Sequence, residues 1–264
     1  MSVLRRVIGL LLLIFWTILM LAVFFLSKLL PNYDSQRLPR FYHAGVCRII
    51  GLSIEFKGEL SEHVPTIFVS NHISYLDIFA LGQKIQASFV AKSDIASWPV
   101  MGKLASFQNT LFIERSANRA KQQLQQFQSH LESQRNLILF PEGTSTNGAE
   151  VKTFKSSLFA AAENPDVQLQ PVTIVYTQYE GKGMTQSRRD DFAWYADMPF
   201  GSHFMKMLSL GKYEAVIEFH EPMRLADFEN RKQCSNYAES VVRKSLKREL
   251  IDSGSSFENN PEST

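Results

Sequence analysis

Hydrophobic residues follow three patterns along the chain. Residues 7–26 are uncharged and rich in Leu, Ile, Val and Phe, and a helix of about twenty residues can span the apolar core of a bilayer. From residue 52, short apolar runs alternate with polar, helix-like segments. Ser, Asn, Glu and Pro dominate the C-terminus, which is typical of disordered chain. We therefore expect a membrane anchor and amphipathic helix over 1–51, a folded domain over 52–251 and a disordered tail over 252–264.

The apolar runs of the domain have the length of strands. We expect them at 52–56, 66–70, 88–91, 110–113, 136–140, 171–176 and 215–220. Helical spacing indicates helices at 117–132, 156–163 and 230–250. This alternation predicts an α/β fold with a mostly parallel central sheet flanked by helices. In such sheets, sites form beyond the carboxyl ends of the strands.

The N-terminal segment has two parts. The apolar run at 7–26 is longer than the core of a cleaved signal peptide, and no small-residue cleavage pattern follows it. We therefore expect an uncleaved anchor, whose orientation the flanking basic residues do not decide. The segment 38–52 mixes apolar and basic residues like an amphipathic helix. It could lie on a membrane surface or pack on the folded domain.

Composition narrows the class of function. The formal net charge of +2 is too small to indicate nucleic-acid binding. Cys47 and Cys234 show neither metal-ligand spacing nor a disulfide framework, so we expect a reducing, cytosol-facing environment and no metal site. A Walker pattern is absent, and the glycines around 181–183 do not form a dinucleotide-binding loop.

Candidate chemistry follows the apolar run 66–70. His72 can accept a proton near neutral pH, and a carboxylate such as Asp77 can fix its tautomer and stabilise its cation. Residues five apart do not share a helix face, so the two can meet only if His72 precedes a helix and Asp77 lies in its first turn. The alternative is structural, because Ser74 and Asp77 also resemble a capping box.

Two further strand ends carry polar groups. Arg115 follows the strand 110–113, and its guanidinium group suits a phosphate, although a surface ion pair would explain it too. The sequence Phe-Pro-Glu-Gly-Thr-Ser at 140–145 follows another strand. It offers groups for substrate hydroxyls or phosphate, or forms an ordinary turn.

Together and in this order, these segments resemble the glycerolipid acyltransferase family, specifically the 1-acylglycerol-3-phosphate acyltransferases. The family's motifs are NHxxxxD, F-[IV]-x-R, FPEGTR and a proline-containing strand, matched at 71–77, 112–115, 140–144 and 170–172. The resemblance covers roughly residues 50–180, half of the chain. Ser145 departs from it, because the third motif usually ends in arginine.

The resemblance implies acyl transfer without a covalent acyl-enzyme. His72 would be the general base on the hydroxyl of a lysophospholipid, and Asp77 would orient it. The donor would be acyl-CoA or acyl-carrier protein, with no cofactor needed, because a thioester is already activated. Arg115, helped by Lys92 or Lys103, would bind the acceptor's phosphate. The residues implied to bind substrate are Asn71, Lys92, Lys103, Arg115, Glu142, Gly143 and Thr144.

We expect a membrane-bound enzyme, with its domain on the cytoplasmic face, that converts lysophosphatidic acid into phosphatidic acid. Because Ser145 removes a cation, another acceptor such as lyso-ornithine lipid is the alternative. A non-catalytic lipid-binding protein is a further alternative. A serine hydrolase is another, but 143–147 fails the G-x-S-x-G pattern at its last position.

Three features outside the motifs remain. The aromatic stretch 192–198 could border an acyl pocket, although packing is the simpler interpretation. We expect His203 and His220 to be structural.

Overall fold

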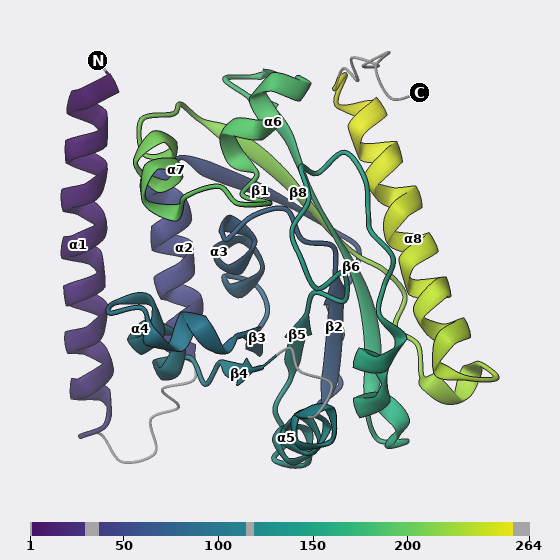
Figure 1. Cartoon of the computed structure of the whole chain (residues 1–264). Coiled ribbons are helices and arrows are strands. Elements are labelled where there is room, and N and C mark those ends of the chain that lie inside the picture. The colour runs from purple at the N-terminus through teal and green to yellow at the C-terminus, as the bar shows by residue number, and fades with distance from the viewer. Residues whose placement is uncertain (1, 30–36, 115–118, 256–264) are drawn as a thin grey trace.

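The computed structural model describes residues 2–29, 37–114 and 119–255. Its centre is an eight-stranded sheet in the order β1-β8-β6-β2-β5-β3-β4, with β7 paired to β6 (Figure 1). The neighbours are parallel except that β6 runs antiparallel to β7 and β8. The predicted fold class is confirmed. The strands are β1 (Leu52–Lys57), β2 (Thr66–Ser70), β3 (Ser88–Lys92), β4 (Leu111–Ile113), β5 (Leu137–Leu139), β6 (Gln168–Tyr179), β7 (Lys182–Gly183) and β8 (Tyr213–Phe219).

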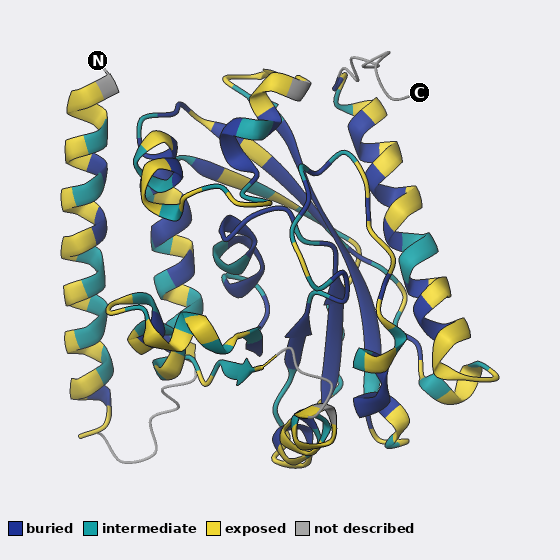
Figure 2. Ribbon diagram, viewed as in Figure 1, coloured by how far each residue is buried: buried dark blue, intermediate teal, exposed yellow. Residues whose placement is uncertain are grey.

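Helices cover both faces of this sheet, as Figure 1 shows. One face carries α1 (Ser2–Ser27), α2 (Leu38–Ile50), α3 (Leu76–Gly82), α4 (Met101–Phe107), α6 (Gln186–Phe192) and α7 (Phe200–Met207). The other face carries α5 (Ala120–Glu132) and α8 (Arg231–Asp252). Two hydrophobic cores therefore form, one on each side of the sheet (Figure 2).

Strand β2 lies at the centre and positions the site. All five of its residues are buried, with Phe68 in one core and Ile67 and Val69 in the other, because alternate side chains point to opposite faces. Its parallel neighbours are β5 and β6. The segments that follow β2 and β5 therefore lie next to each other at one edge of the sheet.

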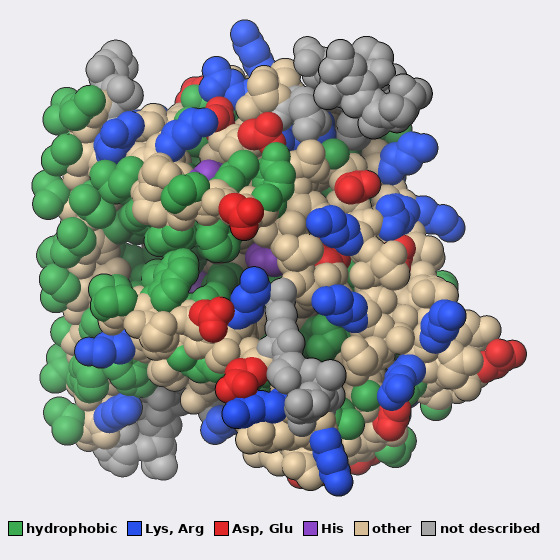
Figure 3. All heavy atoms as spheres, viewed as in Figure 1, with side chains coloured by type: hydrophobic (Ala, Val, Ile, Leu, Met, Phe, Trp, Pro, Cys, Tyr) green, Lys and Arg blue, Asp and Glu red, His purple; other side chains and the backbone are tan. Residues whose placement is uncertain are grey.

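Helix α1 packs on α2 with one side and leaves the other exposed. Trp16 Nε1 donates to the carbonyl of Tyr42 at 3.0 Å. Gly45 permits this approach, because a Cβ there would lie 2.2 Å from the Trp16 ring. The segment Val3–Ser27 is the one described helix long and apolar enough to cross a membrane, and an 18-residue window within it has a mean hydropathy of 2.9. Figure 3 shows its apolar side chains along one edge of the molecule.

Helix α2 resolves the alternative that the sequence left open. Its buried side chains include Val46, Cys47 and Ile50, which belong to the core on that face of the sheet. The amphipathic segment thus packs on the domain and against α1.

Other differences from the predicted elements are small. The segment 156–163 forms a 3₁₀ helix (Ser156–Glu163). The short helices α4, α6 and α7 were not predicted, because seven or eight residues carry little helical periodicity. Helix α8 ends at Asp252, and residues 256–264 of the predicted tail lie outside the described residues. The division into 1–51, 52–251 and 252–264 stays a prediction.

Candidate active site

His72 and Asp77 meet at the carboxyl end of β2. His72 Nδ1 lies 2.8 Å from Asp77 Oδ2. The Asp77 side chain is fully buried, whereas the His72 side chain is 20% exposed. His72 lies in the turn before α3 and Asp77 in its first turn, as the pair requires. The structure thus brings the two predicted catalytic residues together.

Asp77 also organises the turn that holds His72. Its Oδ2 accepts hydrogen bonds from the backbone N–H groups of Ile73 and Ser74, at 2.7 and 2.9 Å. Its Oδ1 accepts one from the Tyr176 hydroxyl at 2.8 Å. One carboxylate therefore both caps the turn and orients the histidine. Ser74 is not the N-cap, since the helix begins after Tyr75 without a side-chain cap.

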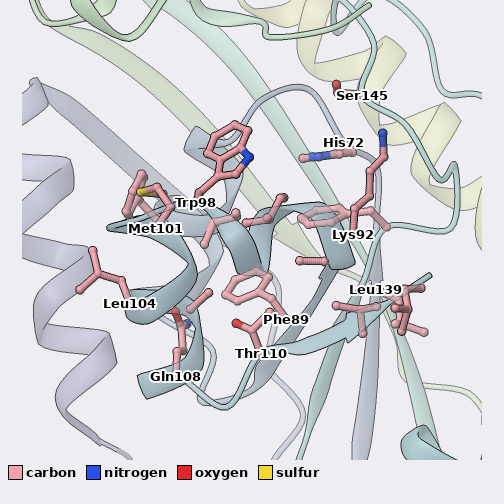
Figure 4. Close-up of a pocket in the computed structure, with 18 of the residues that line it drawn as sticks. His72, Phe89, Lys92, Trp98, Met101, Leu104, Gln108, Thr110, Leu139 and Ser145 are labelled. Carbon is pink, nitrogen blue, oxygen red and sulfur yellow. The ribbon is translucent and has the colours of Figure 1, made fainter. Parts of the chain in front are cut away.

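This arrangement determines which nitrogen of His72 is the base. An ionised carboxylate only accepts hydrogen bonds, so Nδ1 carries the proton that points to Asp77 and Nε2 keeps its lone pair. The ring stacks on Phe140 at a centroid distance of 4.1 Å and an interplanar angle of 18°. Held on one edge and one face, the ring presents its other edge to the cavity described below (Figure 4).

Glu142 positions the backbone of this turn. Its Oε1 accepts from His72 N and its Oε2 from Lys152 N, both at 2.7 Å. Burial raises the pKa of Glu142 to about 7, Asp77 adds to the shift, and the two backbone N–H groups oppose it. Glu142 is buried and does not line the cavity. It supports His72 instead of contacting substrate as predicted.

Asn71 requires a similar correction. Its Nδ2 donates to the carbonyl of Ile174 and its Oδ1 accepts from Ile174 N, both at 2.9 Å. The side chain is 1% exposed and is absent from the cavity lining. Asn71 therefore ties the end of β2 to β6, and its predicted contact with substrate is not available.

A cavity of about 590 Å³ opens beside His72. Helices α1, α2, α3 and α4 and strand β3 form about half of its wall. Figure 4 shows side chains from His72 at one end, past Phe89, to Gln108 and Thr110 at the other. Figure 3 shows histidine atoms beside a hollow lined with apolar side chains. The shape and lining suit a long apolar chain.

Charged side chains line part of the cavity, and Lys92 lies near His72 (Figure 4). Lys92, Asp94 and Lys155 line it, and a Cβ added to Gly143 would lie 2.5 Å from Lys155 Nζ. Lys155 thus places an ammonium group beside the turn whose usual arginine is missing. Gly143 and Thr144 line the cavity, and their contact with substrate stays a prediction.

Of the other predicted cations, one lies away from the cavity and one is not described. Lys103 lies on α4 with its side chain exposed and does not line the cavity. Arg115 lies outside the described residues.

The aromatic stretch 192–198 divides between the two interpretations, because Phe192 packs in the core while residues further along it lie at the cavity. Trp194 and Tyr195 line the cavity, and Trp194 N donates to the carbonyl of Ile73 at 3.0 Å. Ser145 Oγ donates to the carbonyl of Trp194 at 2.5 Å. This serine is engaged with backbone instead of a base, which argues against the serine hydrolase alternative.

Two residues that contact the catalytic pair, Tyr176 and Phe140, were not predicted to do so from the sequence. Tyr176 lies in β6 and Phe140 at the end of β5, so their contacts depend on strand order. Phe140 was part of a recognised motif, but nothing in its spacing indicated stacking on His72. Within the described residues, no group of three or more His, Cys, Asp or Glu could hold a metal ion. The prediction that no cofactor is needed stays untested.

His203 and His220 take part in other contacts. His203 Nδ1 lies 3.1 Å from the Tyr75 hydroxyl, and His220 Nε2 lies 2.8 Å from Thr173 Oγ1. Neither lines the cavity.

The chain is similar in sequence to known proteins. The family model described as "Acyltransferase" matches residues 53–175. The chain is 37% identical over 210 residues to the lyso-ornithine lipid O-acyltransferase of Rhodobacter capsulatus, covering 76% of this chain and 74% of that one. It is 28% identical over 201 residues to the 1-acyl-sn-glycerol-3-phosphate acyltransferase of Neisseria meningitidis, covering 75% and 76%.

The fold is similar to a solved structure as well. The 1-acyl-sn-glycerophosphate acyltransferase of Thermotoga maritima superposes with a TM-score of 0.67 at 20% identity, over 92% of this chain and 97% of that one. The site agrees with this similarity to acyltransferases. Asp77 is buried, one edge of His72 is exposed, and a cavity adjoins that edge. The chain belongs to the acyltransferase family that acts on lysolipids.

Proposed function

We propose that the protein transfers an acyl chain from an acyl thioester to the free hydroxyl of a lysolipid, with lyso-ornithine lipid as its acceptor. The observation that carries this proposal is the exposed edge of His72, which lies at one end of an apolar cavity while Nδ1 is held by buried Asp77. This is the geometry of a general base that serves a lipid substrate.

The reaction needs no nucleophile from the protein. His72 Nε2 takes the proton of the acceptor hydroxyl as that oxygen attacks the thioester carbonyl. A C–O bond forms, the C–S bond breaks, and the departing sulfur takes the proton back from Nε2. Asp77 stabilises the imidazolium cation that forms in between. Acyl-CoA or acyl-carrier protein would supply the thioester, and the cavity would hold its chain.

The acceptor proposal rests on charge and on sequence identity. Ornithine carries a carboxylate and an amino group, and the cavity offers cations at Lys92 and Lys155 and an anion at Asp94. Ser145 removes the cation expected for a phosphate acceptor. Relatives named as lyso-ornithine lipid O-acyltransferases are 32–37% identical to the chain, against 28% for the Neisseria enzyme.

Lysophosphatidic acid remains the second candidate acceptor. The two lysines at the cavity suit a phosphate, and the Neisseria and Thermotoga proteins are named for that substrate. We propose that α1 anchors the enzyme in the membrane with its site on the cytoplasmic face, where acyl donors are found.

An acyl-transfer assay tests this function. The purified full-length protein is given palmitoyl-CoA and either lyso-ornithine lipid, lysophosphatidic acid or another lysophospholipid. We expect His72→Ala to lower kcat/KM by about 10²–10⁴-fold, while His63→Ala, a histidine outside the cavity, retains activity.

The outcomes separate the alternatives. Equal rates for wild type and His72→Ala would refute the general-base mechanism. A lack of acylation of every lysolipid would favour the non-catalytic, lipid-binding alternative. Acylation of lysophosphatidic acid alone would keep the enzyme class and overturn the acceptor.

A further inference from the structure

Residues 194–196, which we call the wall segment, are bound to both turns of the candidate active site. Trp194 N donates to the carbonyl of Ile73, the residue after His72, at 3.0 Å. The carbonyl of Trp194 accepts from Ser145 Oγ at 2.5 Å. Both backbone groups of Trp194 are therefore used, one by the turn that carries His72 and the other by the turn at 140–145. All three residues of the wall segment line the cavity.

The aromatic side chains of the wall segment are held as well. Trp194 Nε1 donates to the carbonyl of Met198 at 2.8 Å. The Tyr195 hydroxyl donates to Asp190 Oδ1 at 2.9 Å. The segment thus presents two fixed aromatic rings at the cavity, in a position set by its hydrogen bonds to the turns of the active site.

The hydrogen bond from Ser145 requires a short side chain. Its hydroxyl is one carbon away from the backbone, so the contact of 2.5 Å brings the backbone of residue 145 close to that of Trp194. The much longer arginine that is usual at this position would push the wall segment away or turn into the cavity. Figure 4 shows Ser145 on the same side of His72 as Lys92. Ser145 therefore does more than omit a cation, because it lets the wall segment approach His72.

The charges at the cavity suit a headgroup of balanced charge. Among the described residues that line it, the charged side chains are Lys92, Asp94 and Lys155, which together carry one net positive charge. Charges that leave water need opposite partners. A phosphate monoester brings about two negative charges at neutral pH. A headgroup with one carboxylate and one ammonium group finds lysines for the first and Asp94 for the second, and an ammonium group also binds to aromatic rings such as those of Trp194 and Tyr195.

We propose that Ser145 is a positioning residue for acceptor selection, because its hydrogen bond to Trp194 holds the wall segment beside His72 as a binding surface for a zwitterionic headgroup. The inference rests on the proposed function, in which His72 activates the hydroxyl of a lysolipid. That hydroxyl and the headgroup are a few bonds apart, so the headgroup lies against the walls next to His72. A lysolipid with a phosphate monoester is bound mainly by charge and gains little from the wall segment.

Competition between acceptors tests the proposal. The full-length protein in detergent receives palmitoyl-CoA with a mixture of lyso-ornithine lipid and lysophosphatidic acid, and the ratio of kcat/KM for the first over the second is measured. Ser145→Ala removes the hydroxyl without adding a charge. We expect it to lower this ratio about three- to tenfold, as for the loss of one hydrogen bond. Ser145→Thr keeps a hydroxyl and should keep the wild-type ratio.

Two further variants separate position from charge. Ser145→Arg removes the hydrogen bond and also adds a cation, so it should lower the ratio more than Ser145→Ala does. Ser202→Ala is the matched control, because Ser202 also donates to a backbone carbonyl, that of Pro199 at 3.1 Å, but does not line the cavity. This control should keep the wild-type ratio. A thermal unfolding curve for each variant verifies that it is folded.

The opposite results overturn the inference. An unchanged ratio in Ser145→Ala with a lowered ratio in Ser145→Arg would show that charge alone selects the acceptor. An equal loss of activity toward both acceptors in Ser145→Ala would give the serine a purely structural role. Both results leave the proposed acyl transfer intact. A wild type that acylates lysophosphatidic acid alone would refute the proposed acceptor together with this inference, and a wild type that acylates neither lipid would refute the proposed function itself.

Discussion

The two ends of the cavity are built in opposite ways. At one end, His72 is held by Asp77 through its ring, by Glu142 through its backbone and by stacking on Phe140. Farther along the cavity, the buried ring of His43 packs beside the rings of Phe79 and Phe89. Strand ends build the first region, and packed helices build the second.

This difference shows how one site meets two demands. Proton transfer tolerates little error in position, and directional hydrogen bonds supply that accuracy. Binding of a long chain needs area more than direction, and apolar contacts are not directional. The chain-binding region also includes α1, whose outer side is exposed and apolar. We therefore expect changes at the first region to affect kcat and changes at the second to affect KM.

The largest effect should come from Asp77→Asn. The carboxamide can place its oxygen where Oδ2 accepts from His72 Nδ1, Ile73 N and Ser74 N, but it carries no negative charge. The imidazolium that forms at His72 during proton transfer would lose its stabilising anion, so we expect kcat to fall by about 10²-fold or more. Steady-state kinetics should show a much smaller change in the KM of the acyl thioester.

Tyr176→Phe is the control for this change. It removes the donor to Asp77 Oδ1 and keeps the His72–Asp77 hydrogen bond. We expect kcat to fall by less than about tenfold, in line with the loss of one hydrogen bond. If Asp77→Asn and Tyr176→Phe had equal effects, the negative charge of Asp77 beside His72 would not be the reason for the loss.

A smaller effect is expected from Glu142→Gln. A carboxamide has a single acceptor oxygen, so either His72 N or Lys152 N loses its partner. We expect a loss of about 1–3 kcal/mol in the free energy of unfolding, measured by denaturation in detergent. The kcat should fall as well, because the backbone of His72 is less firmly held.

The same variant should change the pH dependence of stability. The pKa of Glu142 is raised from 4.5 to about 7 in the fold. Between these values the folded state keeps a proton that the unfolded state has released, so the free energy of unfolding falls as pH rises and levels off above about 7. Glu142→Gln should lack this contribution. Identical slopes for wild type and variant between pH 4.5 and 7 would contradict the assignment.

The smallest effect on turnover should come from Gly45→Val. The added side chain collides with Trp16, and overpacking of this kind costs about 1–3 kcal/mol. It should displace α1, which lines the cavity, and raise the KM of the acyl thioester several-fold with little change in kcat. Gly201→Ala is the control, because a Cβ there meets nothing within 4 Å. A fall in kcat without a change in KM would show that the two regions are not separable.

Much of the scaffold follows from local patterns. All seven predicted strands appear within a few residues of their expected bounds, and the helix expected at 230–250 is α8. These elements are long or strongly apolar, so their periodicity is clear. Helix α4 is short and was missed, although it forms part of the cavity wall. The cavity therefore could not be drawn from the sequence.

The candidate site, like the scaffold, could be predicted from the sequence only in part. The spacing of His72 and Asp77 allowed two interpretations, a catalytic pair or a helix cap, and Asp77 does both. Asn71 and Glu142 were expected to contact substrate, but their polar atoms are used by distant backbone groups. Such assignments require knowing which strands are neighbours, and spacing along the chain does not contain that information.

The sequence by itself determined the α/β class, the apolar N-terminal helix and the residues from which a general base could be made. These features depend on local periodicity and on residue chemistry. Tertiary structure alone decided that Tyr176 of β6 supports Asp77, that α2 packs on the domain, and that His43 is buried in the cavity wall. The physical reason is that each of these outcomes depends on contacts between elements far apart along the chain, which form only when the sheet and its helices pack.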